Sequence, residues 1–184
     1  MNYYAVQVRT GDEDRFVELA RQNIIRSGLP ESVSKNLLWP RRTLTEKKRG
    51  KIKTSLKPLY PGYLFYMGEE LSPELHWVIR RTPGFFRFLK DNQNIEPLTG
   101  RDRETLTHFL RFGEVAEKSK VYFNENNRII VESGPMKGLE GLIVRVDRRK
   151  NRAKIRLSLD KNSLLVDLGF DVIKSSEEKN GKQE

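Results

Sequence analysis

The chain of 184 residues contains no cysteine. Disulfide-stapled folds, thiol nucleophiles and thiolate zinc sites are therefore excluded. Its apolar runs, such as residues 63–67, are far shorter than the stretch of about 20 residues that spans a membrane. The N-terminal segment lacks the basic-then-apolar order of a signal peptide, so we expect a cytoplasmic protein with no membrane partner.

Histidine is also scarce, since only His76 and His108 occur. They fall in different expected helices without companion ligands at metal-binding spacing. The patterns GxxxxGK[ST], GxGxxG, GxSxG and HExxH are all missing from the sequence. We therefore expect no metal, no cofactor, no catalytic residue and no enzymatic activity.

Positive charge is abundant and concentrated. The chain carries 35 Lys and Arg against 25 Asp and Glu, a net charge of +10. Residues 41–57 hold eight basic side chains and one acidic one, and residues 145–156 hold seven basic side chains against Asp147. Clusters of this kind release counterions from a phosphate backbone, so nucleic acid is the leading candidate partner.

The first basic segment has few apolar residues to anchor it, and we expect an exposed, mobile hairpin or loop. The alternative is a solvated face that only keeps the protein soluble. The nucleic-acid candidates in this segment are Arg41, Arg42, Lys47, Lys48, Arg49, Lys51 and Lys53. In the second segment the candidates for RNA or another partner are Arg148, Arg149, Lys150 and Arg152.

The first part of the chain alternates strand and helix signals. Residues 3–8 alternate as a strand does, and Thr10 with Glu13 offers a capping box for a following helix. Residues 59–67 and 85–89 form aromatic strands, Ser72 begins a short helix, and residues 101–112 form another. This order predicts an α+β sandwich, with helices on an antiparallel sheet, over residues 1–112.

The residues after 112 differ from the first part in composition and in the spacing of their apolar runs. Residues 113–127 are rich in Glu, Lys, Ser and Asn and are expected to form a linker. Residues 128–174 contain short β-branched runs separated by glycine and proline, which predicts a small all-β barrel. The polar residues 175–184 are expected to be a disordered tail.

Four patches carry a family resemblance. Residues 3–11 resemble the opening strand of the NusG family of transcription elongation factors, and residues 60–65 resemble its FPGY motif. Residues 81–84 match its R-x-TPG turn, and residues 131–147 look like a KOW motif. The resemblance implies an N-terminal NGN domain, a linker and a C-terminal KOW barrel.

Two departures bear on the subgroup. Housekeeping members carry a Phe-Gly-Arg element late in the barrel, where this chain reads Leu-Ser-Leu-Asp-Lys over residues 157–161. The basic insert before Leu56 and the barrel end at residues 166–170 resemble specialised paralogues of the RfaH and LoaP groups. An operon-specific antiterminator is therefore expected, with a general NusG-type factor as the alternative.

The resemblance implies that the NGN domain binds the clamp helices of bacterial RNA polymerase and favours the closed, processive state. By motif, the clamp-contact candidates are Tyr60, Phe65, Phe85 and Phe88. The competing interpretation is that these aromatic side chains belong to the core. Candidates for contact with the opposite polymerase lobe or the non-template strand are His76, Trp77, Arg80 and Arg81.

The basic insert would contact upstream DNA or a nascent RNA hairpin, as the LoaP resemblance implies. The KOW barrel would recruit a ribosomal protein, a termination factor or RNA, and we expect a monomer. RfaH-like members hide the NGN surface under a helical form of this segment, but its β-branched residues favour the barrel. Two other classes remain open: a free RNA-binding module of ribosome assembly, and, with no supporting carboxylate cluster, an enzyme acting on nucleic acid.

Overall fold

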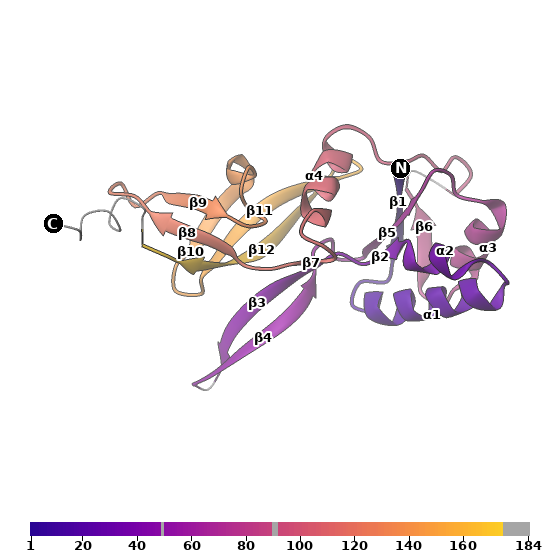
Figure 1. Cartoon of the computed structure of the whole chain (residues 1–184), viewed down its shortest axis with the longest axis horizontal. Coiled ribbons are helices and arrows are strands. Elements are labelled where there is room, and N and C mark those ends of the chain that lie inside the picture. Colours follow the sequence, from indigo (N-terminus) through magenta and orange to yellow (C-terminus); the bar gives the residue numbers. More distant parts are fainter. Residues whose placement is uncertain (49, 90–91, 175–184) are drawn as a thin grey trace. The chain divides into compact units, whose positions relative to one another are not determined.

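The structure is a computed structural model that describes residues 1–48, 50–89 and 92–174, without the side chains of residues 47 and 48 (Figure 1). The tail expected over residues 175–184 lies outside this description. The elements are β1 Asn2–Val8, α1 Glu13–Arg26, α2 Glu31–Lys35, β2 Leu37–Leu38, β3 Arg41–Lys48, β4 Lys51–Pro58, β5 Tyr63–Gly68, α3 Pro73–Arg81, β6 Phe85–Phe88, α4 Gly100–Leu110, β7 Val115–Ala116, β8 Ser119–Phe123, β9 Ile129–Ser133, the 3₁₀ turn η1 Glu140–Leu142, β10 Ile143–Asp147, β11 Arg152–Leu159 and β12 Asn162–Val172. The predicted α+β class is confirmed.

The chain forms two compact units. The first unit contains Met1–Pro40, Pro58–Thr107 and the short turn Leu159–Asn162. The second contains Arg41–Lys57, His108–Ser158 and the residues from Ser163 onward. The basic segment, which the sequence assigned to the first 112 residues, therefore groups with the C-terminal strands.

The first unit is built on a four-stranded sheet in the order β2-β5-β1-β6. β1 runs antiparallel to both β5 and β6, and Tyr4 lies opposite Tyr66. One face of this sheet packs on α1 and α3 through Phe16, Leu75 and Ile79. The strand–helix alternation read from the sequence therefore gives the expected layers.

The opposite face of the same sheet is covered as well. Alternate residues of β1 and β5 point to this second face, and Ala5, Tyr63 and Phe65 among them are also buried. Tyr60 packs edge-on against Phe65, with 5.1 Å between ring centroids. Aromatic residues on both sides of β5 therefore fill two cores, one on each face.

A buried carboxylate joins the start of α1 to the turn before β5. Glu13 is 2% exposed, and its Oε1 accepts a 2.7 Å hydrogen bond from the backbone N–H of Gly62. Its Oε2 accepts a second, 2.8 Å bond from the N–H of Gly11. The helix begins one residue after Asp12, so Glu13 lies in the first turn and bonds Gly11 in place of the expected capping box with Thr10.

The Pro-Gly turn at residues 61–62 has little freedom. Gly62 has a φ of +82°, and a Cβ there would lie 2.8 Å from Thr10 Oγ1. Only glycine adopts this positive φ and allows the close approach of Thr10 without strain. The FPGY-like motif is therefore a backbone requirement at this position.

The second unit contains a five-stranded sheet in the order β10-β11-β12-β8-β9, named here the β domain. It begins at Ser119, inside the segment 113–127 that was expected to be a linker. Ser119 and Val121 alternate with exposed Lys120 and are buried, so strand periodicity outweighs the polar composition of that segment.

The second unit also contains the basic hairpin, defined as β3 and β4. These strands form a three-stranded sheet in the order β4-β3-β7, in which β3 pairs in parallel with β7. Thr43 and Leu44 of β3 are buried, whereas most of β4 is exposed. The expected hairpin is present, with one strand anchored and the other open to solvent.

The described residues contain neither a membrane-spanning helix nor a metal-binding cluster. None of the described helices is both long and apolar enough to cross a bilayer. Over the same part of the chain, no group of three or more His, Cys, Asp or Glu side chains is arranged to hold a metal ion.

Replacing Glu13 with alanine should lower the free energy of unfolding of the first unit by about 1–3 kcal/mol, because two amide donors lose their acceptor. Tryptophan fluorescence during urea unfolding reports on this unit, since Trp39 and Trp77 both lie in it. Glu18→Ala on the exposed side of α1 is the control and should shift stability by less than about 0.5 kcal/mol. Equal stabilities of the two variants would contradict this role of Glu13.

Candidate functional site

Three of the four expected clamp-contact residues are buried. Tyr60, Phe65 and Phe88 are each at most 1% exposed, and Phe85 is half-buried. A clamp contact through these residues requires exposed aromatic side chains, whereas both sides of the sheet are covered. These three side chains therefore belong to the core of the first unit and do not form a surface.

The environment of Tyr60 agrees with a core role. Burial, with a smaller contribution from Asp102, raises the pKa of its hydroxyl far above the ordinary value. The hydroxyl has no hydrogen-bond partner among the described residues. Tyr60 therefore remains uncharged and contributes packing.

An exposed aromatic residue next to this core was missed by the sequence analysis. Phe86 is 67% exposed, although both Phe85 and Phe88 pack inward. In the β1–β6 register Val8 pairs with Phe85 and Gln7 with Arg87, which leaves Phe86 as the extra residue of a bulge. A bulge redirects a side chain, and no sequence pattern marks its position.

α3 presents the second group of candidates. Its start is as predicted, because Ser72 Oγ accepts a hydrogen bond from Leu75 N at 3.2 Å and Pro73 is the first helical residue. Trp77 is 57% exposed, and the Arg80 guanidinium lies 5.8 Å from its ring centroid. An exposed indole beside an arginine is typical of binding anchors.

His76 differs from its neighbours on α3. It is half-buried, with its ring 5.2 Å from that of Phe88. Burial, and secondarily the charge of Arg80, lowers its pKa below the ordinary histidine value. His76 is therefore neutral at pH 7 and belongs to the packing between α3 and β6, while Trp77, Arg80 and Arg81 are exposed.

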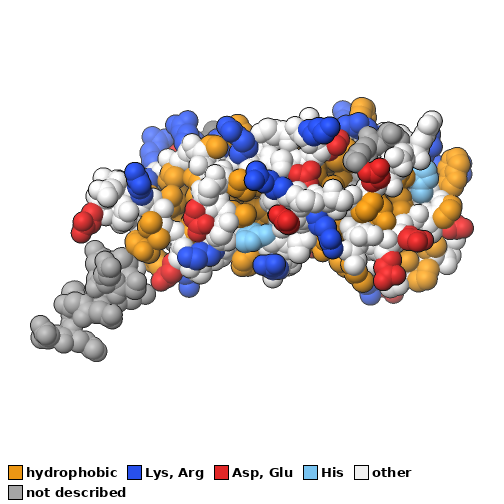
Figure 2. All heavy atoms as spheres, turned by 90° about the horizontal axis from the view of Figure 1, so that it is seen from above, with side chains coloured by type: hydrophobic (Ala, Val, Ile, Leu, Met, Phe, Trp, Pro, Cys, Tyr) orange, Lys and Arg blue, Asp and Glu red, His pale blue; other side chains and the backbone are white. Residues whose placement is uncertain are grey.

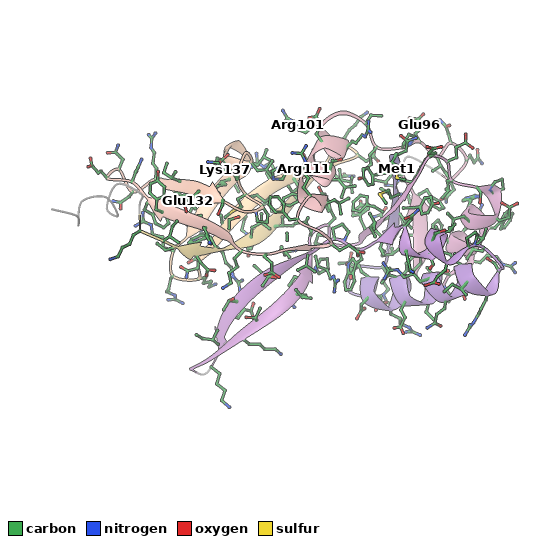
Figure 3. The ribbon with its side chains drawn as sticks, viewed as in Figure 1. Met1, Glu96, Arg101, Arg111, Glu132 and Lys137 are labelled. Atoms are coloured by element: carbon green, nitrogen blue, oxygen red, sulfur yellow. The ribbon has the colours of Figure 1, made fainter. Side chains whose placement is uncertain are left out.

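The basic hairpin divides its charges between two roles. Lys51 and Lys53 are exposed on β4 and are available to phosphate. Figure 3 shows long side chains that extend from the hairpin strands into open space. The side chains of Lys47 and Lys48, and Arg49 altogether, lie outside the described residues. Arg41 anchors the hairpin backbone, since its N–H donates to the carbonyl of Glu114 at 2.7 Å.

Arg42 is a structural residue, contrary to its assignment as a nucleic-acid contact. Its Nε donates to the backbone carbonyl of Asp167 at 2.7 Å. Burial lowers the pKa of its guanidinium to about 10, with the charge of Asp167 opposing and that of Arg152 adding to this effect. A guanidinium held in this way joins β3 to β12 and is largely buried.

The turn between β10 and β11, residues 148–151, is named here the basic turn. Arg148 lies with its guanidinium 3.7 Å from the Phe123 ring centroid, and its Nη2 donates to the carbonyl of Asn127 at 2.9 Å. The backbone is fixed as well, because Phe170 N donates to the carbonyl of Asn151 at 3.0 Å. Arg148 therefore supports the turn.

Arg149 and Lys150 are the free cations of the basic turn. Both are exposed, and neither side chain makes an ion pair within the described part of the chain. Arg152 is different, since only 13% of its side chain is exposed and it bonds to Glu46 at 3.1 Å. Of the four C-terminal candidates, two are available to a partner and two are structural.

Some cations outside the two basic segments pair with nearby carboxylates. Figure 2 shows one face of the molecule, on which Lys and Arg side chains lie among Asp and Glu. Examples outside the basic segments are Lys35, which pairs with Glu31 at 2.9 Å, and Lys118, which pairs with Asp171 at 3.1 Å. The two basic segments differ from these examples in holding several exposed cations close together in sequence with few acidic residues.

Comparison with known proteins identifies relatives of the whole chain. The family model "Transcription termination factor nusG" matches residues 1–107. The transcription termination/antitermination protein NusG of Thermus thermophilus is 25% identical over 182 residues, covering 94% of this chain and 97% of the relative. The Campylobacter jejuni protein of the same name is 26% identical over 171 residues, covering 93% and 95%.

A solved structure shares the fold. The structure "Domain interaction in Thermotoga maritima NusG" aligns with a TM-score of 0.52 at 19% identity, covering 91% of this chain and 93% of that chain. The architecture of a mixed α/β unit followed by a small β domain is therefore one already observed in solved proteins.

Replacing Arg148 with alanine should destabilise the β domain by about 1–2 kcal/mol, because the stacked cation and its bonds to Asn127 are lost. Amide hydrogen exchange of the full chain measures the loss of stability, and backbone amides of β8 and β10 should exchange faster in the variant. Arg149→Ala is the matched control in the same turn and should leave exchange unchanged. If both variants exchange alike, Arg148 has no structural role.

Proposed function

Because the chain belongs to the NusG family of transcription factors, we propose that it is a transcription elongation and antitermination factor. The observation that carries this proposal is the family match over residues 1–107, which include nearly all of the first unit. In this proposal the first unit binds bacterial RNA polymerase and holds it in the closed, processive state. The second unit contacts nucleic acid.

The surface proposed for polymerase consists of Phe86, Trp77 and Arg80. It replaces the buried aromatic residues that the motifs suggested. Two observations support it. Phe86 and Trp77 are exposed, and their neighbours in sequence, Phe85 and His76, both pack on the buried ring of Phe88. Aromatic and arginine side chains on a fixed support supply most of the binding energy in protein interfaces.

We further propose that the factor acts on particular operons. The basic hairpin supports this version, because its exposed Lys51 and Lys53 are available to a nucleic-acid element that recruits the factor. A general NusG-type role is the second candidate, and the names and nearly full-length coverage of the curated relatives favour it. Read-through on only some leader sequences would indicate the operon-specific factor, and read-through on all of them would indicate the general one.

Transcription in vitro through a terminator tests the function. Adding the protein to its cognate polymerase should raise read-through, and the pair Phe86→Ala and Trp77→Ala should abolish the effect. An anchor of this type contributes about 2 kcal/mol to binding. Because two neighbouring contributions are not fully additive, loss of both should lower polymerase affinity by roughly a hundredfold or more. A wild-type protein that changes neither pausing nor termination would contradict the proposal.

Matched variants separate binding from folding. Ile25→Ala removes an exposed apolar side chain from α1 of the same unit and should leave read-through intact. Phe65→Ala should instead destabilise the unit by about 3–5 kcal/mol, because it empties a buried aromatic site. Loss of activity in Phe86→Ala with unchanged unfolding therefore identifies a contact residue.

Salt dependence tests the nucleic-acid contact. If Lys51 and Lys53 each neutralise a phosphate, replacing both with alanine should reduce the slope of log Kobs against log salt by about 1.4–1.8 for any RNA or DNA probe. Lys35→Ala, whose ion pair lies in the first unit, is the control. An unchanged slope in the double variant would show that the hairpin lysines do not bind phosphate.

A further inference from the structure

Two basic segments that are about a hundred residues apart in sequence converge in the second unit. β3 is fixed to β12 by the hydrogen bond from Arg42 Nε to the carbonyl of Asp167. It is also fixed to β11, because Arg152 Nη2 donates to the carbonyl of Thr45 at 3.1 Å. The basic hairpin and the basic turn are therefore two walls of one structure.

Arg152 forms the floor between these walls. Its Nη2 bonds Glu46 Oε1 at 3.1 Å, and its Nη1 lies 3.9 Å from Asp167 Oδ2. Lys154 Nζ bonds the other carboxylate oxygen of Asp167 at 2.8 Å. These ion pairs hold Arg152 in place between two carboxylates of the same unit, while its Nε and Arg42 Nη1 are buried without a hydrogen-bond partner among the described residues.

Close packing completes the contact. A Cβ at Gly169 would lie 3.0 Å from the carbonyl of Thr43 and 3.2 Å from Lys118 Cγ. Glycine at this position of β12 allows the backbone of β3 to approach. The distance between β3 and β12 is thereby set by backbone contact.

A hollow of about 770 Å³ lies between the walls. Its lining includes four cations, one carboxylate and one exposed apolar side chain: Lys118, Arg149, Lys150, Arg152, Glu46 and Ile52. The hollow is within the range of small-molecule sites, about 300–1,000 Å³. It has room for one nucleotide and none for a base-paired helix.

We propose that this hollow binds an unpaired nucleotide, splayed out of a loop or bulge of an RNA hairpin. Its base lies against Ile52, and its phosphates meet Arg149 and Lys150, the two lining cations that form no ion pair with any described residue. Sequence-specific RNA recognition uses unstacked bases of this kind. The inference rests on the proposed nucleic-acid contact. It adds the place of binding, which is the hollow, and the form of the RNA, which is an unpaired nucleotide.

The chemistry favours a nucleotide over an acidic peptide. A carboxylate side chain satisfies the cations but fills little of the hollow and leaves Ile52, 74% exposed, without a partner. A nucleotide supplies a flat apolar face and flanking negative charge together. Lys51 and Lys53 adjoin Ile52 in β4 but point to the other face of the strand, where they meet phosphates of the paired stem.

The test uses the full-length chain and four probes: an RNA stem with a randomised unpaired loop, a fully paired RNA duplex of equal length, single-stranded DNA, and polyglutamate. Ile52→Ala and Arg149→Ala should each weaken binding to the looped RNA by roughly tenfold and leave duplex binding nearly unchanged. Both residues are exposed, so the variants should fold. Leu165→Ala and Arg156→Ala are the matched exposed controls in the β domain.

Equal losses on looped and paired RNA, or no loss on either, would overturn the proposed nucleotide site. In that case a reduced salt slope for the Lys51 and Lys53 variant would leave the proposed function standing, so the two failures are distinguishable. Competition by polyglutamate that matches the looped RNA would identify an acidic peptide instead. Single-stranded DNA that shows the same tenfold dependence would overturn the assignment to RNA.

Discussion

Asp167 holds the second unit together. Its carbonyl accepts the Arg42 hydrogen bond, and its carboxylate lies between Arg152 and Lys154. Without this residue three cations would face one another at the join between the basic hairpin and the β domain, a costly arrangement in a partly buried site. One carboxylate therefore allows two strongly basic segments to pack side by side and leave their remaining charge for a partner.

The same pattern holds in both units. A long basic or aromatic side chain packs or bonds within its unit where a neighbour is in reach, and it is exposed to a partner where none is. In the first unit Tyr60, Phe65 and Phe88 fill a core, while a bulge exposes Phe86. In the second unit Arg148 stacks on Phe123, while Arg149 next to it is free. Adjacent residues of the same type therefore have opposite roles, and the local contact decides which.

Much of the fold could be predicted, because it depends on short-range patterns. Alternation in β1, the Ser72-Pro73 helix start and the glycine turn at residue 62 follow from local sterics and hydrogen bonding. The site could be predicted only in outline. The charge of residues 41–57 was visible, but the burial of Arg42 depends on Asp167, a residue more than a hundred positions away.

The sequence by itself determined the class of the fold, the family motifs, the two basic segments and the lack of thiol chemistry, since each is a matter of composition or local period. Tertiary structure alone decided that both faces of the first sheet are covered, that residues 119–123 pair as a strand, and that the hairpin joins the β domain. These outcomes depend on which distant segments meet, and composition and period carry no information about that.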